Sequence, residues 1–277
     1  MKRLSLLTLC ALSCFLAACG SGSTSSPANK ASVSAVSSDQ LVYRKITNFT
    51  VTGQNLDLGI NISNLACLRI TEVAGGTATR RVFSCKIVGV GTFPMTVTAG
   101  DGSTLNTTNF TVPLVNQPQV TMVTSLGTIV MELNPARAPV SVDNFLNYVE
   151  SSFYVNTIFH RVESNFVIQG GGFTSALTQP ATMPAIKLEA GNGLSNLRGT
   201  VALARTNVLD SATSQFFVNV VDNAALDTNN GGYAVFGKVV QGLDVVDRIR
   251  AVPVSTQGGL TNVPVTPITI NSVVQSQ

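Results

Sequence analysis

The segment 159–172, with the sequence FHRVESNFVIQGGG, decides the fold that we predict for this chain. It contains His160, the only histidine of the 277 residues, and Arg161 follows it directly. Gln169 comes eight positions after the arginine, beyond an apolar and aromatic run, and the glycines 170–172 end the segment. A guanidinium fork, an amide and an apolar surface together suit an uncharged, peptide-like ligand. We expect a tight turn at the glycines rather than a phosphate cradle, because no helix pattern follows them.

Strand-like runs surround this segment throughout residues 119–277. They lie at 120–124, 128–133, 158–162, 166–169, 199–204, 215–220, 233–240 and 266–274. Between them, Val142, Phe145, Leu146 and Val149 have the i, i+3, i+4, i+7 spacing of one apolar helix stripe, and a second short helix is expected at 243–250. Eight strands and two helices predict a mainly β fold, an eight-stranded closed antiparallel β-barrel capped by the helices.

Shorter alternating runs with glycine-rich turns fill residues 39–115 and predict a small β-sandwich, whose pattern resembles immunoglobulin-like modules. We expect two domains, the sandwich over 39–115 and the barrel over 116–277, joined by a proline-stiffened segment at 112–118. Cys67 and Cys85 are 18 positions apart. In an oxidising compartment they would form a disulfide worth about 3 kcal/mol through loop entropy, and two buried free thiols are the alternative.

The N-terminus is typical of an exported protein. A basic start and an apolar run that is too short to span a membrane predict a signal peptide over 1–18. The sequence LAAC that ends at Cys19 resembles a lipobox, which implies cleavage before Cys19 and its acylation; an ordinary signal peptide with an incidental cysteine is the alternative. Residues 19–38 are a predicted flexible tether. We expect a lipid-anchored protein of the periplasm or cell envelope, and Gly20 after the cysteine favours the outer membrane.

Composition argues against several classes of function. The chain has 17 basic and 14 acidic residues, or 15 against 14 once Lys2 and Arg3 leave with the signal, so no charge pattern favours nucleic acid. One histidine and no Cys-x-x-Cys pair argue against a metal site, and we expect no cofactor. The sequence has no Gly-x-Ser-x-Gly motif, which argues against a serine hydrolase. It also has no long apolar helix stripe of the kind that forms obligate oligomers, so we expect a monomer.

Several motifs in fixed order within residues 119–277 resemble a cyclophilin, a peptidyl-prolyl cis-trans isomerase, and most of all the bacterial periplasmic branch. The motifs are APVSVDNF at 138–145, FHRV at 159–162, FVIQGGG at 166–172, RGTVALAR at 198–205, SATSQFF at 211–217 and YAVFGKVV at 233–240. The resemblance covers about 57% of the chain (159 of 277 residues). It implies rotation of X–Pro bonds in proline-containing polypeptide clients, and thereby help in folding exported proteins.

Rotation about an X–Pro bond needs no nucleophile, metal or cofactor. The barrier is ~18–20 kcal/mol because resonance gives the C–N bond double-bond character. In the twisted amide the proline nitrogen becomes a basic acceptor, so a donor aimed at it is bonded better in the transition state than in the ground state. Arg161, permanently charged and rigid, is the predicted donor. One such hydrogen bond is worth ~1.5–3 kcal/mol, so desolvation and substrate positioning must supply the remainder.

The resemblance also implies the binding groove. Its residues are Phe166, Val167, Ala204, Arg205, Gln215, Phe217, Leu226 and Tyr233. Phe166, Val167, Phe217 and Leu226 correspond to the proline pocket, although plain barrel core is an alternative for the larger three. Gln169 corresponds to the residue that orients the arginine and the substrate carbonyl. The backbone at positions 204 and 205 would bind the extended peptide. His160 is placed at the groove rim, where it either contacts substrate or supports the groove.

Four groove positions depart from the family's pattern. Val167 replaces a usual methionine, which predicts a stiffer and shallower pocket floor. Ala225 stands where many eukaryotic members have a tryptophan that contacts cyclosporin. Tyr233 replaces a histidine and Arg205 replaces an asparagine. These departures argue against tight cyclosporin binding, while the arginine, glutamine and phenylalanine set for isomerisation is intact.

Two other functions remain open on the sequence. The barrel could be a non-catalytic chaperone that holds proline-containing segments, although pure binding would not need Arg161. The chain could also be a surface interaction lipoprotein whose activity resides in residues 39–115. Deleting 39–115 would separate these functions.

Overall fold

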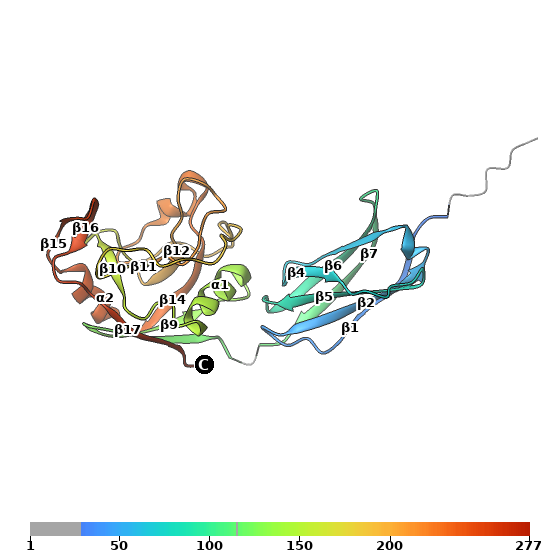
Figure 1. Ribbon diagram of the computed structural model, residues 1–277, viewed down its shortest axis with the longest axis horizontal. Coiled ribbons are helices and arrows are strands. Elements are labelled where there is room, and N and C mark those ends of the chain that lie inside the picture. Colours follow the sequence, from blue (N-terminus) through green and yellow to red (C-terminus); the bar gives the residue numbers. More distant parts are fainter. Residues whose placement is uncertain (1–28, 115) are drawn as a thin grey trace, which may run out of the picture.

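The computed structural model describes residues 29–114 and 116–277, which form two groups of β-sheets along one long axis (Figure 1). The predicted signal peptide at 1–18, the predicted acylation site Cys19 and the first part of the tether lie outside the described residues. Within the described ranges, no helix is both long and apolar enough to cross a membrane.

Seven strands form the N-terminal sheets. They are β1 (Ser32–Ser38), β2 (Ile46–Gln54), β3 (Ile60–Ser63), β4 (Cys67–Glu72), β5 (Arg80–Ile87), β6 (Gly91–Ala99) and β7 (Thr104–Val112), with a short 3-10 helix η1 (Leu56–Leu58) after β2. One sheet has the order β1-β2-β5-β4 and the other β3-β6-β7. Phe49, Phe83 and Met95 from the two sheets meet in one core. Cys67 on β4 is bonded to Cys85 on β5, with their Cα atoms 5.5 Å apart.

Residues 32–38, predicted as part of the flexible tether, form strand β1 instead. This strand pairs antiparallel with β2, from Ser32 opposite Gln54 to Ser38 opposite Phe49. All of its side chains are exposed or half-buried, so the segment has little hydrophobic pattern. The pairing depends on main-chain hydrogen bonds along the edge of β2, which any extended backbone can make. Composition alone therefore pointed to a tether.

Eight strands form the barrel. They are β8 (Gln119–Thr124), β9 (Gly127–Leu133), β10 (Thr157–Val162), β11 (Val167–Thr174), β12 (Thr200–Leu203), β13 (Phe216–Asn219), β14 (Val235–Gln241) and β17 (Ile270–Gln275), in the spatial order β10-β11-β13-β12-β14-β9-β8-β17. This confirms the predicted mainly β fold with an eight-stranded antiparallel barrel. Closure is incomplete, because β10 and β17 meet at an isolated bridge between Ile158 and Thr269 rather than along a ladder.

Three smaller elements lie outside the barrel ladder. A hairpin of β15 (Val254–Gln257) and β16 (Leu260–Pro264) packs beside β10. Two short 3-10 helices, η2 (Ala224–Asp227) and η3 (Asn229–Gly231), lie in the connection between β13 and β14. Both features border the groove described below.

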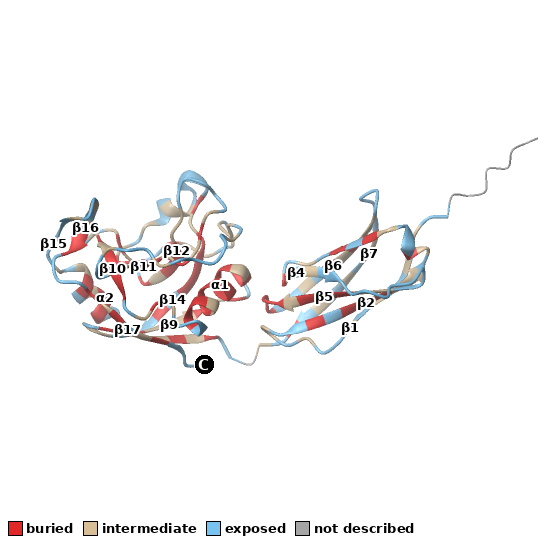
Figure 2. Cartoon of the chain, viewed as in Figure 1, coloured by how far each residue is buried: buried red, intermediate tan, exposed pale blue. Residues whose placement is uncertain are grey.

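The apolar stripe predicted as a helix forms α1 (Pro139–Glu150), and the second predicted helix is α2 (Leu243–Arg250). The whole stripe of α1 is buried against the barrel, as the red segments of Figure 2 show. Phe145 at its centre packs against the rings of Tyr154, Phe216 and Phe236, with centroids between 5.1 and 5.6 Å away. Burial of one such side chain stabilises the fold by about 1.5–3 kcal/mol.

The first turn of α1 is capped from a distant loop. Ala138 at the N-cap position has no side-chain oxygen to offer. The carboxylate of Glu189 instead accepts hydrogen bonds from the backbone amides of Val140 and Ser141, at 3.0 and 2.8 Å. A carboxylate at this end satisfies free amides and is favoured by the helix dipole. Burial raises the pKa of Glu189, while these hydrogen bonds oppose the rise.

The polar face of α1 is turned toward the near end of the N-terminal sheets (Figures 1 and 2). Arg44 donates to Asp143 through Nε at 2.9 Å, to Glu150 through Nη1 at 2.5 Å and to Asn147 through Nη2 at 2.8 Å. Lys86 on β5 reaches the same Oδ1 of Asp143 at 2.7 Å. Asp143 is consequently almost fully buried. The helix therefore lies between the barrel on one side and two cations on the other, Arg44 of the β1–β2 connection and Lys86 of β5.

Candidate active site

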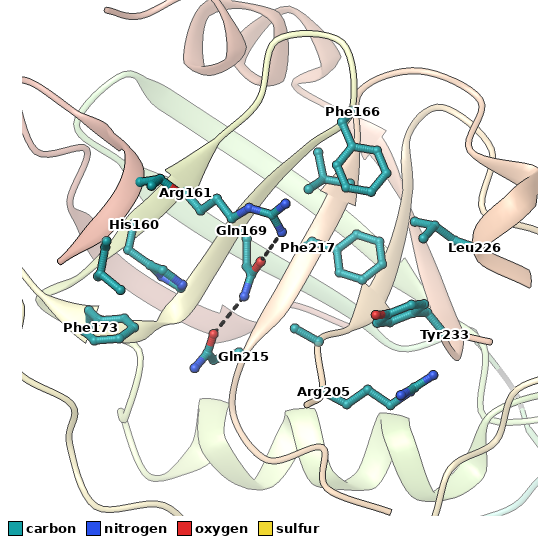
Figure 3. Close-up of a pocket in the computed structure, with 14 residues that line it drawn as sticks. His160, Arg161, Phe166, Gln169, Phe173, Arg205, Gln215, Phe217, Leu226 and Tyr233 are labelled. Carbon is teal, nitrogen blue, oxygen red and sulfur yellow. Dashed lines mark hydrogen bonds between the residues drawn. The ribbon is translucent and has the colours of Figure 1, made fainter. Parts of the chain in front are cut away.

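A groove of about 340 Å³ opens on the outer surface of the barrel. It is lined by His160, Arg161, Phe166, Val167, Gln169, Phe173, Ala204, Arg205, Gln215, Phe217, Leu226, Tyr233, Leu260 and Thr261 (Figure 3). Every residue predicted to be catalytic or substrate-binding is in this set, whereas Ala225, the position of the eukaryotic tryptophan, is not. Strand pairing brings these distant parts of the chain together.

The centre of the groove is a row of three side chains on neighbouring strands. Arg161 of β10 lies opposite Gln169 of β11, and Gln169 lies opposite Phe217 of β13. Residues directly opposite one another on antiparallel strands point to the same face of the sheet. The three side chains therefore project together from the outer face, as Figure 3 shows. Gln169 follows Arg161 by eight positions because the chain must pass through the β10–β11 connection before it returns opposite the arginine.

Hydrogen bonds fix the polar side chains of this row. Nη1 of Arg161 donates to Oε1 of Gln169 at 3.2 Å, and Nε2 of Gln169 donates to Oε1 of Gln215 at 2.8 Å, the two dashed lines of Figure 3. On its other side Arg161 donates to Oε1 of Glu163, from Nε at 2.9 Å and from Nη2 at 2.5 Å. The guanidinium is thus held from two directions inside the groove.

An apolar pocket lies beside the guanidinium. Val167 and Phe217 are buried in a small cluster that is separate from the main barrel core. Phe166 and Leu226 are partly buried against this cluster. These residues form the wall of a surface pocket, which argues against the alternative of plain barrel core. The Cζ atom of Arg161 lies 5.7 Å from the centroid of the Phe166 ring, so the cation stands at the edge of the pocket.

The resemblance suggested that His160 lies at the groove rim, whereas the structure places it in the groove wall. Only 4% of the residue is exposed. Neighbouring residues of a strand normally point to opposite faces, but the β10–β11 register shifts between Phe159 and Arg161. This irregularity lets His160 and Arg161 both line the groove. The imidazole packs against the ring of Phe173, with centroids 4.7 Å apart.

The imidazole of His160 is neutral near pH 7. Its pKa is lowered to about 4, mainly by burial and to a smaller extent by the nearby charge of Arg161. Its Nδ1 atom is buried and has no hydrogen-bond partner in the described part of the chain. Arg161 is therefore the cationic group at this end of the groove.

Arg205 lines the groove at the Tyr233 end, and the peptide-binding role of its backbone stays a prediction. Its side chain folds back over the ring of Tyr233, with Cζ 4.6 Å from the centroid. It also donates to the carbonyls of Gly232 at 3.0 and 2.8 Å, Asn230 at 2.6 Å and Thr206 at 2.9 Å. The side chain therefore holds the loop that carries Tyr233. The backbone amide of Ala204 donates to the carbonyl of Gln215 at 2.9 Å and is engaged within the barrel.

The glycine triplet lies within strand β11, so the predicted tight turn was wrong. Gly171 has φ +77°, and a Cβ atom there would stand 2.7 Å from Tyr154 and 2.9 Å from the carbonyl of Ser214. A Cβ atom on Gly172 would stand 2.5 Å from the side chain of Gln215. Glycine is needed at position 171, where φ is positive and β11 passes close to a backbone carbonyl, whereas the flexible Gln215 could move aside at position 172.

Three residues that line the groove and one that holds Arg161 were missed from the sequence. Phe173 directly follows the glycine triplet and could have been found from that position. Glu163 lies two residues after Arg161, where a strand returns to the same face, and this spacing was a usable signal. Leu260 and Thr261 come from the β15–β16 hairpin, about 100 residues further along, and no local signal marked them.

The fold and the groove match a known family. Residues 119–275 match the sequence model of the cyclophilin type peptidyl-prolyl cis-trans isomerases. The chain belongs to this family. The residues of the cyclophilin match contain all eight barrel strands and every residue that lines the groove.

Named relatives agree with this assignment. Peptidyl-prolyl cis-trans isomerase A of Dickeya dadantii is 56% identical over 155 residues, which are 55% of this chain and 82% of the relative. Peptidyl-prolyl cis-trans isomerase B of Escherichia coli is 48% identical over 163 residues, 57% of this chain and 99% of the relative. A crystal structure of a cyclophilin type isomerase from Cryptosporidium parvum superposes with TM-score 0.50 at 26% identity, covering 58% of this chain and 99% of that chain. The barrel is thus a peptidyl-prolyl cis-trans isomerase.

Proposed function

We propose that this cyclophilin rotates X–Pro bonds by holding the proline ring in the apolar pocket while Arg161 donates to the proline nitrogen of the twisted amide. The observation that carries the proposal is the position of the guanidinium, which Gln169 holds at the edge of the Phe166 pocket. A donor placed there bonds the pyramidal nitrogen better than the planar one, and this difference lowers the barrier.

The pocket supplies the remaining stabilisation. Phe166, Val167, Phe217 and Leu226 line an apolar site, where a bound X–Pro bond would be shielded from water and the field of the cation strengthened. The short, branched side chain of Val167 makes this floor stiff. The chain of hydrogen bonds from Gln169 to Gln215 extends the polar side of the groove, where the carbonyl that precedes proline would turn.

The extended substrate would lie against the strand end at Arg205, whose side chain is occupied by the 230–232 loop. His160 supports the groove as a neutral wall residue.

The clients in this proposal are exported, proline-containing polypeptides. The export signal at 1–18, the lipobox ending at Cys19 and the disulfide between Cys67 and Cys85 all agree with an oxidising envelope compartment. A lipid on Cys19 would anchor the protein, with the outer membrane favoured. We further propose that the N-terminal sheets are an immunoglobulin-like module over 39–115, now extended by β1, which spaces a monomeric isomerase from the membrane.

A proline-limited refolding assay tests the enzymatic part of the proposal. Wild-type protein should accelerate the slow refolding phase of an unrelated client whose rate is set by an X–Pro bond. The Arg161→Ala variant should lose about tenfold to hundredfold of that acceleration, because one charge-assisted hydrogen bond is removed. A chaperone that only holds proline segments would keep its effect in the variant, and that result would contradict the proposal.

Metabolic labelling with an alkyne fatty acid tests the anchor. Wild-type protein should carry label and fractionate with the outer membrane, whereas Cys19→Ala should carry none and be released. An unlabelled wild-type protein would show that the cysteine is incidental and the signal peptide ordinary.

A further inference from the structure

Glu163 holds the guanidinium of Arg161 before any substrate arrives. Both Nε and Nη2 of Arg161 donate to Oε1 of Glu163, and Nη1 donates to Gln169. All three nitrogen atoms are therefore engaged. Since a guanidinium has five N–H groups, two remain for a ligand in the groove.

The carboxylate is itself fixed by its surroundings. Asn262 of the β15–β16 hairpin donates from Nδ2 to the same Oε1 atom at 3.3 Å. The backbone amide of Glu163 donates to the carbonyl of Val167 at 2.9 Å, and its carbonyl accepts from the amide of Phe166 at 3.0 Å. The turn that places the carboxylate is thus the same turn that begins the proline pocket.

A simple surface ion pair does not account for this arrangement. Both side chains are about one-third exposed, at 38% for Arg161 and 32% for Glu163, and exposed pairs stabilise folds little. Their value here lies in geometry. A long arginine side chain is flexible, and each bond to a fixed partner removes orientations in which its remaining N–H groups point away from the pocket.

We propose that Glu163 is a positioning residue, which acts through Arg161 and fixes the plane of its guanidinium toward the proline nitrogen. The inference rests on the proposed function of Arg161. The proposal also predicts the direction in which removal of Glu163 changes the isomerisation rate. If Glu163 acted only by its charge, removing it would leave a stronger cation in the groove and raise the rate. If it acts by position, removing it lowers the rate.

The test compares Glu163→Ala, Glu163→Gln and the control Glu132→Ala in the soluble 20–277 protein. Glu132 is a similarly exposed, ion-paired carboxylate on β9 and does not line the groove. We expect Glu163→Ala to lower kcat for an Ala-Pro peptide about tenfold with KM changed less than about twofold, because orientation acts in the transition state. Glu163→Gln, which keeps one acceptor, should recover part of kcat. Glu132→Ala should match wild type.

The NMR signal of the Arg161 Nε–H group gives a second readout. It should be sharp and protected from solvent exchange in the wild type and in Glu132→Ala, and it should exchange rapidly in Glu163→Ala. An unchanged or increased kcat in Glu163→Ala, or an Nε–H signal that stays protected, would overturn the proposal. A wild type without isomerase activity would refute the proposed function, and the Nε–H signal would still decide whether Glu163 fixes the guanidinium.

Discussion

At the scale of single residues, the groove uses one permanent charge beside a neutral imidazole. Burial and the adjacent charge of Arg161 both lower the pKa of His160, because a second cation in a partly desolvated groove would be unfavourable. The imidazole beside the proposed donor Arg161 therefore does not titrate near neutrality.

The lowered pKa of His160 predicts a loss of stability in acid. The unfolded imidazole binds a proton below about pH 6.5, whereas the folded one resists protonation until about pH 4. Between these values the unfolded state binds more protons, so the free energy of unfolding falls as the pH falls, by about 3 kcal/mol in total. Urea unfolding of wild type and His160→Gln at pH 7 and pH 4 measures the difference.

In that comparison the variant should lose less stability on acidification than the wild type. Equal losses would show that other groups cause the acid sensitivity. The kcat/KM of the wild type should show no inflection between pH 6 and pH 8, because His160 stays neutral throughout that range.

At the scale of elements, the pairing of Arg161 with Gln169 on neighbouring strands and the apolar stripe of α1 could be predicted from the sequence. The stripe of α1 follows from the helical period, and the pairing of Arg161 with Gln169 follows from a short connection between two strands. The irregularity at His160, the close approach at Gly171 and the extra strand β1 could not be predicted. These three depend on neighbouring backbone that a local pattern does not contain.

The loop at 229–233 is held by the side chain of Arg205. All three guanidinium nitrogen atoms of Arg205 donate to carbonyls of this loop or of Thr206. The loop in turn places Tyr233 against Phe217. We expect Arg205→Ala to raise the Kd of a proline peptide roughly threefold to tenfold, a cost of about 1 kcal/mol, with little change in kcat. Arg205→Lys should not rescue it, since an ammonium cannot reproduce the planar fork.

NMR titration with an Ala-Pro peptide measures this effect. Arg198→Ala is the matched control, because Arg198 is ion-paired with Asp247 away from the groove. A variant at position 205 that bound the peptide with wild-type affinity would show that the loop keeps its position without the arginine.

At the scale of the whole molecule, α1 joins the two groups of sheets. Arg44 and Lys86 converge on Asp143, whose side chain is only 3% exposed, and this is the kind of buried charge that is costly to leave without partners. None of these residues lines the groove. The arrangement therefore predicts one rigid particle whose isomerase groove stays open to clients.

Removing both cations tests this arrangement. In Arg44→Ala/Lys86→Ala, we expect the barrel and the N-terminal sheets to tumble independently, because separation returns Asp143 to water. The kcat/KM for a short peptide should change less than about twofold, since the groove is remote from α1's polar face. Rotational correlation times from NMR relaxation report the tumbling, with Lys45→Ala as the control cation. Unchanged joint tumbling would show that these ion pairs are not what holds the parts together.

The proposed mechanism depends on Arg161, and the exchange rate of a proline peptide is the readout closest to its role. The cis-trans exchange rate of a short Ala-Pro peptide can be followed by NMR with the soluble 20–277 protein and with Arg161→Ala. The account predicts strong acceleration by the wild type and a loss of about tenfold to hundredfold in the variant, while both proteins bind the peptide with similar affinity. A folded wild type that binds the peptide without accelerating its exchange, or a variant as fast as the wild type, would contradict the central claim.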